Sequence, residues 1–290
     1  MSDLNGKTIF ITGATRGIGR EIALRCARDG AKVVITGKTD QPHPKLPGTI
    51  HSVAKEVIAA GGQALALQLD VRDAQAIQDA MAQASAHFGG IDVLVNNASA
   101  ISLTPTLDTP VRRLDLMWEV NMRATFLAAQ ACIPYLKNAV NPHVLTLSPP
   151  PNLDPRWFSP HVAYTMSKYG MTLCTLGMAH EFAVDGIAFN CLWPRTTIAT
   201  AAIEFNFPPE ILRASRKPAI VADAAHAILL RDSNSCSGNF FVDDILLRDS
   251  NSCSGNFFVD ESVLREAGVT DFAQYAVDPG VPPFKDLFLD

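Results

Sequence analysis

Tyr164 and Lys168 are a pair of side chains whose types and spacing suit acid–base chemistry. They lie in residues 162–183, where the apolar pattern predicts a long helix. Because residues four apart share one face of a helix, the ammonium group would lie beside the phenol. A nearby positive charge favours the phenolate and lowers the tyrosine pKa from its usual value of about 10. The pair therefore predicts a phenol that exchanges a proton near neutral pH.

Asn121 and Ser148 are two further polar residues that could belong to such a site. Asn121 lies in an apolar part of residues 107–136, expected to be a short loop followed by one long helix. A buried asparagine needs hydrogen-bond partners, so it either bridges helix and sheet or takes part in function. Ser148 follows residues 144–147, a predicted strand, and precedes three prolines that make the next loop irregular.

A glycine-rich turn near the N-terminus predicts a binding site for a dinucleotide. The turn reads Thr12-Gly13-Ala14-Thr15-Arg16-Gly17-Ile18-Gly19 and lies between an apolar strand-like run and a helical pattern that ends at Gly30. A second strand-like run, residues 31–35, completes a strand–helix–strand unit. Glycines allow a tight turn close to a diphosphate, and the helix that begins there directs N–H groups at it.

The residues after the second strand favour NADP over NAD. Many dinucleotide folds carry an acid here, which binds the adenosine ribose hydroxyls. In this chain Gly37 holds that place and Lys38 follows it. A glycine does not repel a 2′-phosphate, a lysine can pair with one, and Arg16 adds a second cation. The alternative is that Lys38 is an ordinary solvated lysine.

Strand-like and helical patterns alternate along the chain, which predicts an α/β, Rossmann-like, doubly wound parallel sheet with helices on both faces. We expect a single domain over residues 1–290. In such sheets ligands bind beyond the carboxyl ends of the strands. Four residues follow predicted strands on that edge: Gly13, Lys38, Asp70 and Asn97.

Composition narrows the classes of function. The net charge of −5 argues against nucleic acid or an anionic membrane surface as the main partner. No apolar run is long enough to span a bilayer. The cysteines and histidines lack metal-ligand spacing, so we expect no metal site and free thiols in a reducing compartment. The chain begins without a signal-peptide pattern and ends without a peroxisomal tripeptide, which favours the cytoplasm and leaves an organelle open.

Residues 228–244 and 245–261 are two copies of one unit that differ only at their last position, Asp244 against Glu261. Two copies are too few for a repeat architecture. Each copy contains one strand-like run, Gly-Asn-Phe-Phe-Val-Asp, and the sheet needs one final strand. We therefore expect one copy to pair in the sheet and the other to lie outside it as a loop.

The chain resembles the short-chain dehydrogenase/reductase family over nearly its whole length. The resemblance rests on the glycine-rich turn, Asn96-Asn97-Ala98, Asn121 and the Tyr-x-x-x-Lys motif, in that order. It implies hydride transfer between NADP(H) and a carbonyl or secondary alcohol. Tyr164 would donate a proton to the substrate oxygen, and Lys168 would lower the tyrosine pKa and bind the nicotinamide ribose. Asn121 would hold a water that links Lys168 to solvent.

The same resemblance implies the contacts with the cofactor. The residues that would touch it are Gly13, Arg16, Gly17, Ile18 and Gly19 at the phosphates, Asp70 and Val71 at adenine, Asn97 along its length, Lys168 at the ribose and Pro194 at the nicotinamide. It also implies a homo-oligomer, formed through the helices near 107–136 and 162–183.

One departure from the family pattern matters. A serine that binds the substrate oxygen usually stands where this chain has Pro151, or Pro149 if the alignment starts from the strand. Ser148 is the nearest hydroxyl, and Asn152 is a second candidate. Loss of one such donor typically costs about 10²–10³ in rate. Two functions therefore stay open: an oxidoreductase for a hydrophobic or lipid-like substrate, and an NADP-binding regulatory module with little catalysis.

The residues expected to line an apolar substrate pocket in the first case are Leu153, Trp157 and Phe158. They follow the proline-rich loop, close in sequence to the tyrosine motif. Their apolar side chains are the reason for favouring a hydrophobic substrate.

Overall fold

A parallel β-sheet lies at the centre of the computed structural model, which describes residues 3–44, 46–237 and 257–289. Its strand order is β3-β2-β1-β4-β5-β6-β7, and every neighbouring pair is parallel. Strands β1, β4, β5 and β6 are buried along their whole length, whereas the edge strand β3 is half-buried and is exposed at its two end residues. The described strands are β1 (Thr8–Ile11), β2 (Lys32–Gly37), β3 (Gln63–Gln68), β4 (Val93–Asn96), β5 (His143–Leu147), β6 (Ala188–Trp193) and β7 (Phe257–Val259).

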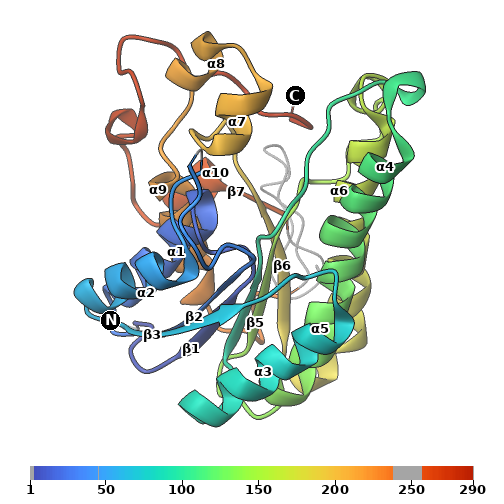
Figure 1. The fold of residues 1–290 in the computed structure, drawn as a ribbon. Helices are drawn as coiled ribbons and strands as arrows, with labels where there is room; N and C mark the ends of the chain where they lie inside the picture. Colours follow the sequence, from blue (N-terminus) through green and yellow to red (C-terminus); the bar gives the residue numbers. More distant parts are fainter. Residues whose placement is uncertain (1–2, 45, 238–256, 290) are drawn as a thin grey trace.

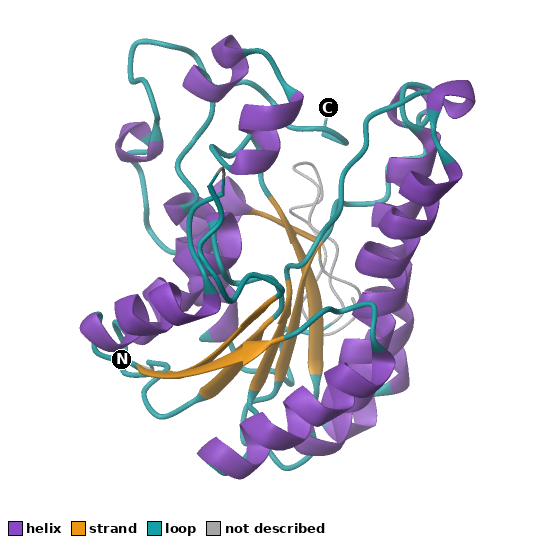
Figure 2. Cartoon of the chain, in the orientation of Figure 1, coloured by secondary structure: helices purple, strands orange, loops and turns teal. Residues whose placement is uncertain are grey.

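Helices cover both faces of the sheet (Figure 2). One face carries α1 (Gly17–Ala27), α2 (Ile50–Ala59), α9 (Ala219–Leu229) and α10 (Asp260–Glu266). The other face carries α3 (Ala74–Phe88), α5 (Ala124–Leu136) and α6 (Val162–Glu181). The short helices α4 (Val111–Met117), α7 (Ala201–Asn206) and α8 (Pro209–Arg213) lie beyond the carboxyl edge of the strands (Figure 1). The predicted Rossmann-like α/β domain is confirmed.

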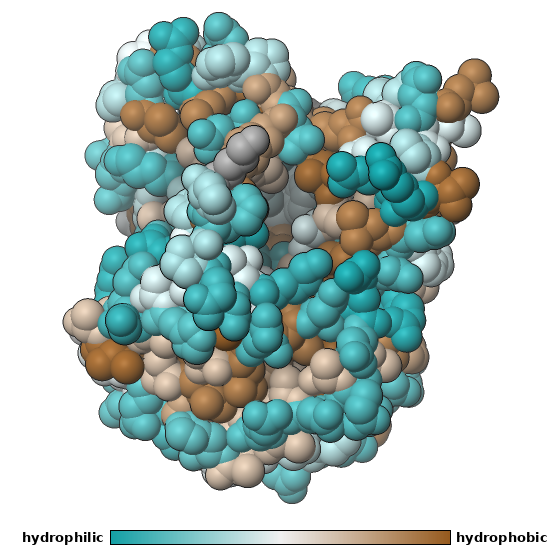
Figure 3. Space-filling model, viewed as in Figure 1, coloured by the Kyte–Doolittle hydropathy of each residue, from teal (hydrophilic) through white to brown (hydrophobic). Residues whose placement is uncertain are grey.

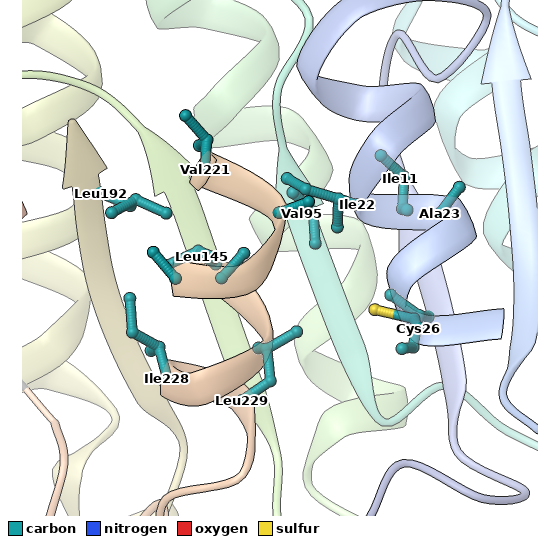
Figure 4. Packing of buried hydrophobic residues seen from close by; sticks show 14 of the residues in the cluster. Ile11, Ile22, Ala23, Cys26, Val95, Leu145, Leu192, Val221, Ile228 and Leu229 are labelled. Carbon is teal, nitrogen blue, oxygen red and sulfur yellow. The ribbon is translucent and has the colours of Figure 1, made fainter. Parts of the chain in front are cut away.

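The hydrophobic core between the sheet and helices α1 and α9 fixes the position of the glycine-rich turn that precedes α1. Ile22 of α1 and Ile228 of α9 pack against strand residues Ile11, Val95 and Leu145, all of them fully or almost fully buried (Figure 4). Burial of an aliphatic side chain stabilises the fold by about 1.5–3 kcal/mol. The start of α1, which carries the glycine-rich turn, is therefore fixed rigidly to the sheet.

The expected loop and long helix within residues 107–136 are present, and the helical stretch from α4 to α5 is continuous but contains a π-helical segment. After a 3₁₀ turn at Thr106–Asp108, α4 ends at Met117 and a π-helical segment, Trp118–Arg123, leads into α5. A π-helical segment inserts an extra residue and often occurs at functional sites. It brings Asn121 to full burial and turns that side chain toward α6.

One copy of the tandem repeat forms a strand of the sheet. Strand β7 comes from the second copy and pairs with β6. The first copy contributes the end of α9 and Cys236, whose backbone oxygen accepts a hydrogen bond from Asn190 Nδ2 at 2.6 Å. The strand-like run of the first copy, residues 238–243, lies outside the described residues, so its predicted loop conformation stays a prediction.

Candidate active site

The glycine-rich turn joins β1 to α1 and leaves the start of the helix open. Gly13 and Gly17 have φ angles of +68° and +55°, a region that only glycine enters readily. A Cβ on Gly19 would lie 2.5 Å from Asn97 Nδ2 and 2.7 Å from Gly13 O, so that position has no room for a side chain. The N-cap residue, Arg16, makes no side-chain cap on α1. The free N–H groups and the helix dipole there suit a diphosphate.

Asn97, the residue directly after β4, stabilises the glycine-rich turn through hydrogen bonds. Its Nδ2 donates to Thr12 O and Gly13 O, both at 2.9 Å, and its backbone N donates to Thr12 Oγ1 at 3.0 Å. These bonds occupy the whole Asn97 amide N–H₂ group with the backbone of the turn. Asn97 therefore shapes the turn and also faces the cavity in front of it.

A cavity of about 440 Å³ opens along the carboxyl edge of the sheet, in front of the turn. The surface in Figure 3 is hollowed in this region, between the parts formed by α7 and α8 and by α4. Eight of the residues expected at the cofactor line it: Gly13, Arg16, Gly17, Ile18, Lys38, Asp70, Val71 and Asn97. Gly19 lies behind the turn, while Lys168 and Pro194 line an adjoining cavity.

Two cations, Arg16 and Lys38, line this cavity, and a third, Arg72, binds the lining residue Asp70. Asp70 binds Arg72 Nη2 at 2.6 Å and lies 3.7 Å from Lys38 Nζ. The hydrogen bond from Arg72 lowers the pKa of Asp70 to about 2, so that carboxylate stays ionised. Arg16 Nη1 is buried and has no hydrogen-bond partner among the described residues. Sequence reasoning missed Arg72, although its place two residues after the strand-end Asp70 was a usable signal.

An adjoining cavity of about 160 Å³ contains the tyrosine and the lysine. Tyr164 and Lys168 of α6 both line it and are 5% and 2% exposed. Lys168 Nζ donates to Leu147 O at 2.6 Å and lies 5.1 Å from the centre of the Trp193 ring. The Tyr164 hydroxyl has no hydrogen-bond partner among the described residues, so it is available to a ligand.

The protonation of this pair corrects the expectation of a lowered tyrosine pKa. Burial raises the pKa of Tyr164, and the nearby charge of Asp286 raises it further. Burial also lowers the pKa of Lys168 to about 7. Removal of both groups from water favours their neutral forms. In this structure Tyr164 is a phenol that holds its proton.

Asn121 links two segments next to the lysine. Its Oδ1 accepts from Ala100 N at 2.7 Å, and its Nδ2 donates to Ala100 O and to Ser167 Oγ, both at 2.9 Å. These bonds join the loop after β4 to α6, one residue before Lys168. The side chain therefore positions the lysine-bearing helix, and its expected water to Lys168 stays a prediction.

Ser148 is turned into the core, which corrects its expected role at the substrate oxygen. Its hydroxyl donates to Cys191 Sγ at 3.2 Å and accepts from Thr172 Oγ1 at 3.1 Å, and the residue is fully buried. Asn152 bonds through its backbone N and O to the Tyr169 hydroxyl. Neither residue is among the described residues that line the tyrosine cavity.

The apolar residues expected at the substrate also lie elsewhere. Leu153 and Phe158 line a groove on the outer face of α5 and α6, away from the tyrosine cavity. Trp157 packs against Phe288, near the C-terminus. The apolar residues that line the tyrosine cavity are Ile18, Ile101, Leu147, Trp193, Ile198, Ala202, Ile203, Phe207 and Leu287.

The family signature described as short chain dehydrogenase matches residues 7–207, which is more than half of the chain. The chain belongs to the short-chain dehydrogenase family. This confirms the resemblance and places the chain among NAD(P)-dependent oxidoreductases. Whether such a dehydrogenase prefers NADP or NAD is not decided by family membership, because relatives of both kinds exist.

This short-chain dehydrogenase is similar to hydroxysteroid dehydrogenase-like protein 2 of Danio rerio, with 52% identity over 99% of the chain. The chain spans 65% of that relative's length. Among solved structures, a putative dehydrogenase from Xanthomonas campestris is 52% identical, with a TM-score of 0.91 and full coverage of both chains.

Two more distant solved structures of the family contain cofactors of different kinds. A metagenomic short-chain oxidoreductase in complex with NADP is 26% identical, with a TM-score of 0.69 over 83% of this chain and 98% of its own. A 7α-hydroxysteroid dehydrogenase with NADH and 7-oxo glycochenodeoxycholic acid is 25% identical, with a TM-score of 0.70 over 89% and 93%. The cofactor preference of this dehydrogenase must therefore be argued from its own residues.

Two further findings concern membrane-spanning helices and metal sites in this dehydrogenase. In residues 3–44, 46–237 and 257–289, no helix has both the length and the apolar character needed to cross a bilayer. Within the same ranges, no group of three or more His, Cys, Asp or Glu residues has the geometry to hold a metal ion.

Proposed function

We propose that this short-chain dehydrogenase transfers a hydride between NADP(H) and a carbonyl or secondary alcohol. The observation that carries the proposal is the free hydroxyl of Tyr164, which lines a cavity adjoining the dinucleotide cavity. Ile18 and Asn97 line both cavities, so a nicotinamide ring held in the first would reach the second. A carbonyl in the tyrosine cavity would then have a proton donor on one side and the cofactor on the other.

In the direction of reduction, the tyrosine gives up its proton. The cofactor supplies the hydride that adds to the carbonyl carbon. Tyr164 donates its phenolic proton to the carbonyl oxygen, so that the product is a neutral alcohol. Lys168, with a pKa lowered to about 7, can return a proton to the phenolate and exchange it with solvent. The raised pKa of Tyr164 keeps the phenol protonated, although it also makes the phenol a weaker acid, and it disfavours the phenolate that alcohol oxidation requires.

The proposed preference for NADP rests on the cations that line the cavity and on the glycine that stands, in place of an acidic residue, at the end of β2. Gly37 leaves room at the end of β2, and Lys38 and Arg16 line the same cavity. The buried Arg16 Nη1 has no partner among the described residues, and a 2′-phosphate would supply one. Asp70 bonds with Arg72 and so is less available to repel the phosphate.

The substrate is proposed to be apolar, because apolar side chains form most of the tyrosine cavity. Trp193, Ile198 and Phe207 contribute large apolar surfaces to it. An apolar wall favours a substrate whose carbonyl carries hydrocarbon groups.

A second copy of the chain is proposed to cover the outer face of α5 and α6. That face has an apolar groove of about 620 Å³, and Leu173 in it is 63% exposed. A contiguous apolar patch of this kind typically marks an interaction site. The buried free thiols Cys26, Cys132 and Cys191 agree with a reducing compartment, and we propose the cytoplasm.

The alternative function, an NADP-binding module with little catalysis, is favoured by the orientation of Ser148 alone. A comparison of Tyr164→Phe with the original chain separates the two functions. Binding of NADPH and NADH is followed by fluorescence, and turnover is followed with a panel of apolar ketones and aldehydes. The oxidoreductase proposal expects turnover that falls by about 10²–10⁴-fold in the variant while NADPH still binds. NADPH binding without turnover by either protein supports the binding module.

A further inference from the structure

The C-terminal tail, residues 284–289, crosses the mouth of the active site. Figure 1 shows the C-terminus between α7 and α4, beyond the carboxyl edge of the sheet. The tail is tied to the segment after β6: Thr197 N donates to Phe284 O, and Asp286 N donates to Arg195 O, both at 3.0 Å. Trp193 Nε1 also donates to Leu287 O at 3.0 Å. The tail is therefore a fixed part of the site.

Phe288 is the most deeply buried side chain of this tail, at 1% exposure. Its ring centre lies 5.4 Å from that of Tyr169, 5.9 Å from Trp193, 6.0 Å from Trp157 and 6.4 Å from the catalytic Tyr164. Aromatic rings at these separations attract one another beyond the effect of burial alone. Phe288 thus closes an aromatic cluster whose other members include the proposed proton donor.

The backbone of Phe288 shows that its surroundings hold it in place. Its φ angle is +73°, and it is the one non-glycine residue with positive φ among residues 3–44, 46–237 and 257–289. Bulky side chains rarely adopt this conformation, which persists only where neighbouring contacts stabilise it. The aromatic contacts and the Trp193–Leu287 hydrogen bond are those contacts.

The result is a small cavity beside the tyrosine. Its volume of about 160 Å³ is well below the roughly 300–1,000 Å³ typical of pockets that hold larger ligands. Leu287, next to Phe288, forms part of its wall, and both pack in the cluster with Tyr164 and Trp193. The phenyl ring of Phe288 is not among the lining residues of this cavity; it packs behind the wall that Tyr164, Trp193 and Leu287 form, and so fixes the position of that wall.

We propose that Phe288 is a specificity-determining residue that limits the substrate to small, neutral, apolar ketones and aldehydes. This inference rests on the proposed function, and it narrows the substrate class of the same site. A long-chain or fused-ring carbonyl does not fit beside Tyr164 while Phe288 stays in the aromatic cluster. Removal of the phenyl ring leaves an apolar space behind the wall that Tyr164, Trp193 and Leu287 form, so the wall can move back and the cavity can accept a larger apolar guest.

The test compares Phe288→Ala with Phe284→Ala, a matched change in the same tail at a residue that is 47% exposed. The ratio of kcat/KM for 2-dodecanone to that for 2-butanone is measured with NADPH for both variants and for the original chain. The expected ratio rises at least about 10-fold in Phe288→Ala and stays unchanged in Phe284→Ala. A ratio that is equal in all three proteins overturns the inference. Phe288→Leu, which keeps an apolar side chain, is expected to give an intermediate ratio.

A binding measurement separates this inference from the proposed function. The neutral fluorophore N-phenyl-1-naphthylamine is titrated into the NADPH-loaded proteins, which needs no turnover. Binding at least about 10-fold tighter to Phe288→Ala than to the original chain and Phe284→Ala supports the inference even if no ketone is reduced. Equal affinities overturn it, while turnover that depends on Tyr164 would leave the proposed function in place.

Discussion

Tyr164 of α6 and Asp286 of the C-terminal tail line the same cavity, and the carboxylate charge raises the pKa of the phenol. Asp286 Oδ1 accepts a hydrogen bond from Leu287 N at 2.8 Å. Burial, together with the charge of Asp260, raises the pKa of Asp286 to about 7, and Lys168 opposes this rise. Lys168 and Asp286 therefore both have a pKa of about 7 in one small site, and the charge of each affects the pKa of the other.

The first prediction concerns Asp286 and the dependence of stability on pH. In an unfolded chain the carboxyl titrates at about 3.9, whereas in the folded chain its pKa is about 7. The folded state binds the proton more tightly, so the stabilising contribution is complete below pH about 4 and is lost as the pH rises to about 7. Asp286→Asn removes this loss.

Thermal unfolding at pH 5 and pH 8 tests this prediction. Relative to the original chain, Asp286→Asn is expected to gain more stability at pH 8 than at pH 5, by an amount on the order of 2 kcal/mol. Asp79→Asn, on the exposed side of α3, is the control and should leave the pH dependence unchanged. If Asp286→Asn and the original chain show the same pH dependence, ionisation of Asp286 does not destabilise the folded state and the prediction is wrong.

The second prediction concerns Arg16 and the choice of cofactor. A charge-assisted hydrogen bond contributes about 1.5–3 kcal/mol, so Arg16→Gln should weaken NADPH binding by about 10- to 100-fold. NADH lacks the 2′-phosphate, and its affinity should change little. Arg28→Gln, at the other end of α1, is the control. Fluorescence titration of the original chain and both variants gives the six affinities, and an equal loss for both cofactors would mean that Arg16 does not contact the 2′-phosphate.

The third prediction concerns Gly19, where a Cβ would lie within 2.7 Å of Gly13 O. Gly19→Ala must displace the turn or the Asn97 side chain, and we expect NADPH affinity to fall at least about 10-fold because the diphosphate contacts depend on that geometry. Gly177→Ala in α6 has nothing within 4 Å of the new Cβ and is the control. Its affinity should be unchanged, and its unfolding temperature unchanged or raised. Unaltered binding by Gly19→Ala would refute the proposed position of the diphosphate.

The fourth prediction concerns the outer face of α5 and α6. Leu173→Glu places a charge in the apolar groove and should dissociate the proposed homo-oligomer into single chains, because an unpaired charge is costly to bury. Val140→Glu, at a residue 89% exposed outside the groove, should leave the mass unchanged. Light scattering after size-exclusion chromatography measures both. If the original protein has the mass of a single chain, the proposed homo-oligomer is wrong.

Local patterns were sufficient to predict the glycine-rich turn and most of the residues that line the cavity in front of it. The glycine spacing from Gly13 to Gly19 and the alternation of strands and helices depend on neighbouring residues, so they can be recognised in the sequence. The i,i+4 spacing likewise brought Tyr164 and Lys168 into one cavity.

The substrate end could not be predicted, because it depends on contacts between distant segments. Nothing in the pattern of residues 284–289 indicates that Phe288 packs on the tyrosine of α6. The orientation of Ser148 is set by Cys191 and Thr172, which lie on other elements. The tyrosine pKa was expected to fall and instead rises, because burial and the charge of Asp286 both favour the neutral phenol.

Transfer of deuterium to a small apolar ketone from NADPH that carries deuterium at both nicotinamide C4 positions tests the central claim most directly. Mass spectrometry of the product alcohol is expected to show one deuterium per molecule. Tyr164→Phe should slow its appearance by about 10²–10⁴-fold, while its NADPH affinity stays within about 3-fold of the original value. Tyr169→Phe, in the same helix, should transfer deuterium at a rate close to that of the original chain. Bound NADPH that transfers no deuterium, or an unchanged rate in Tyr164→Phe, would contradict the account.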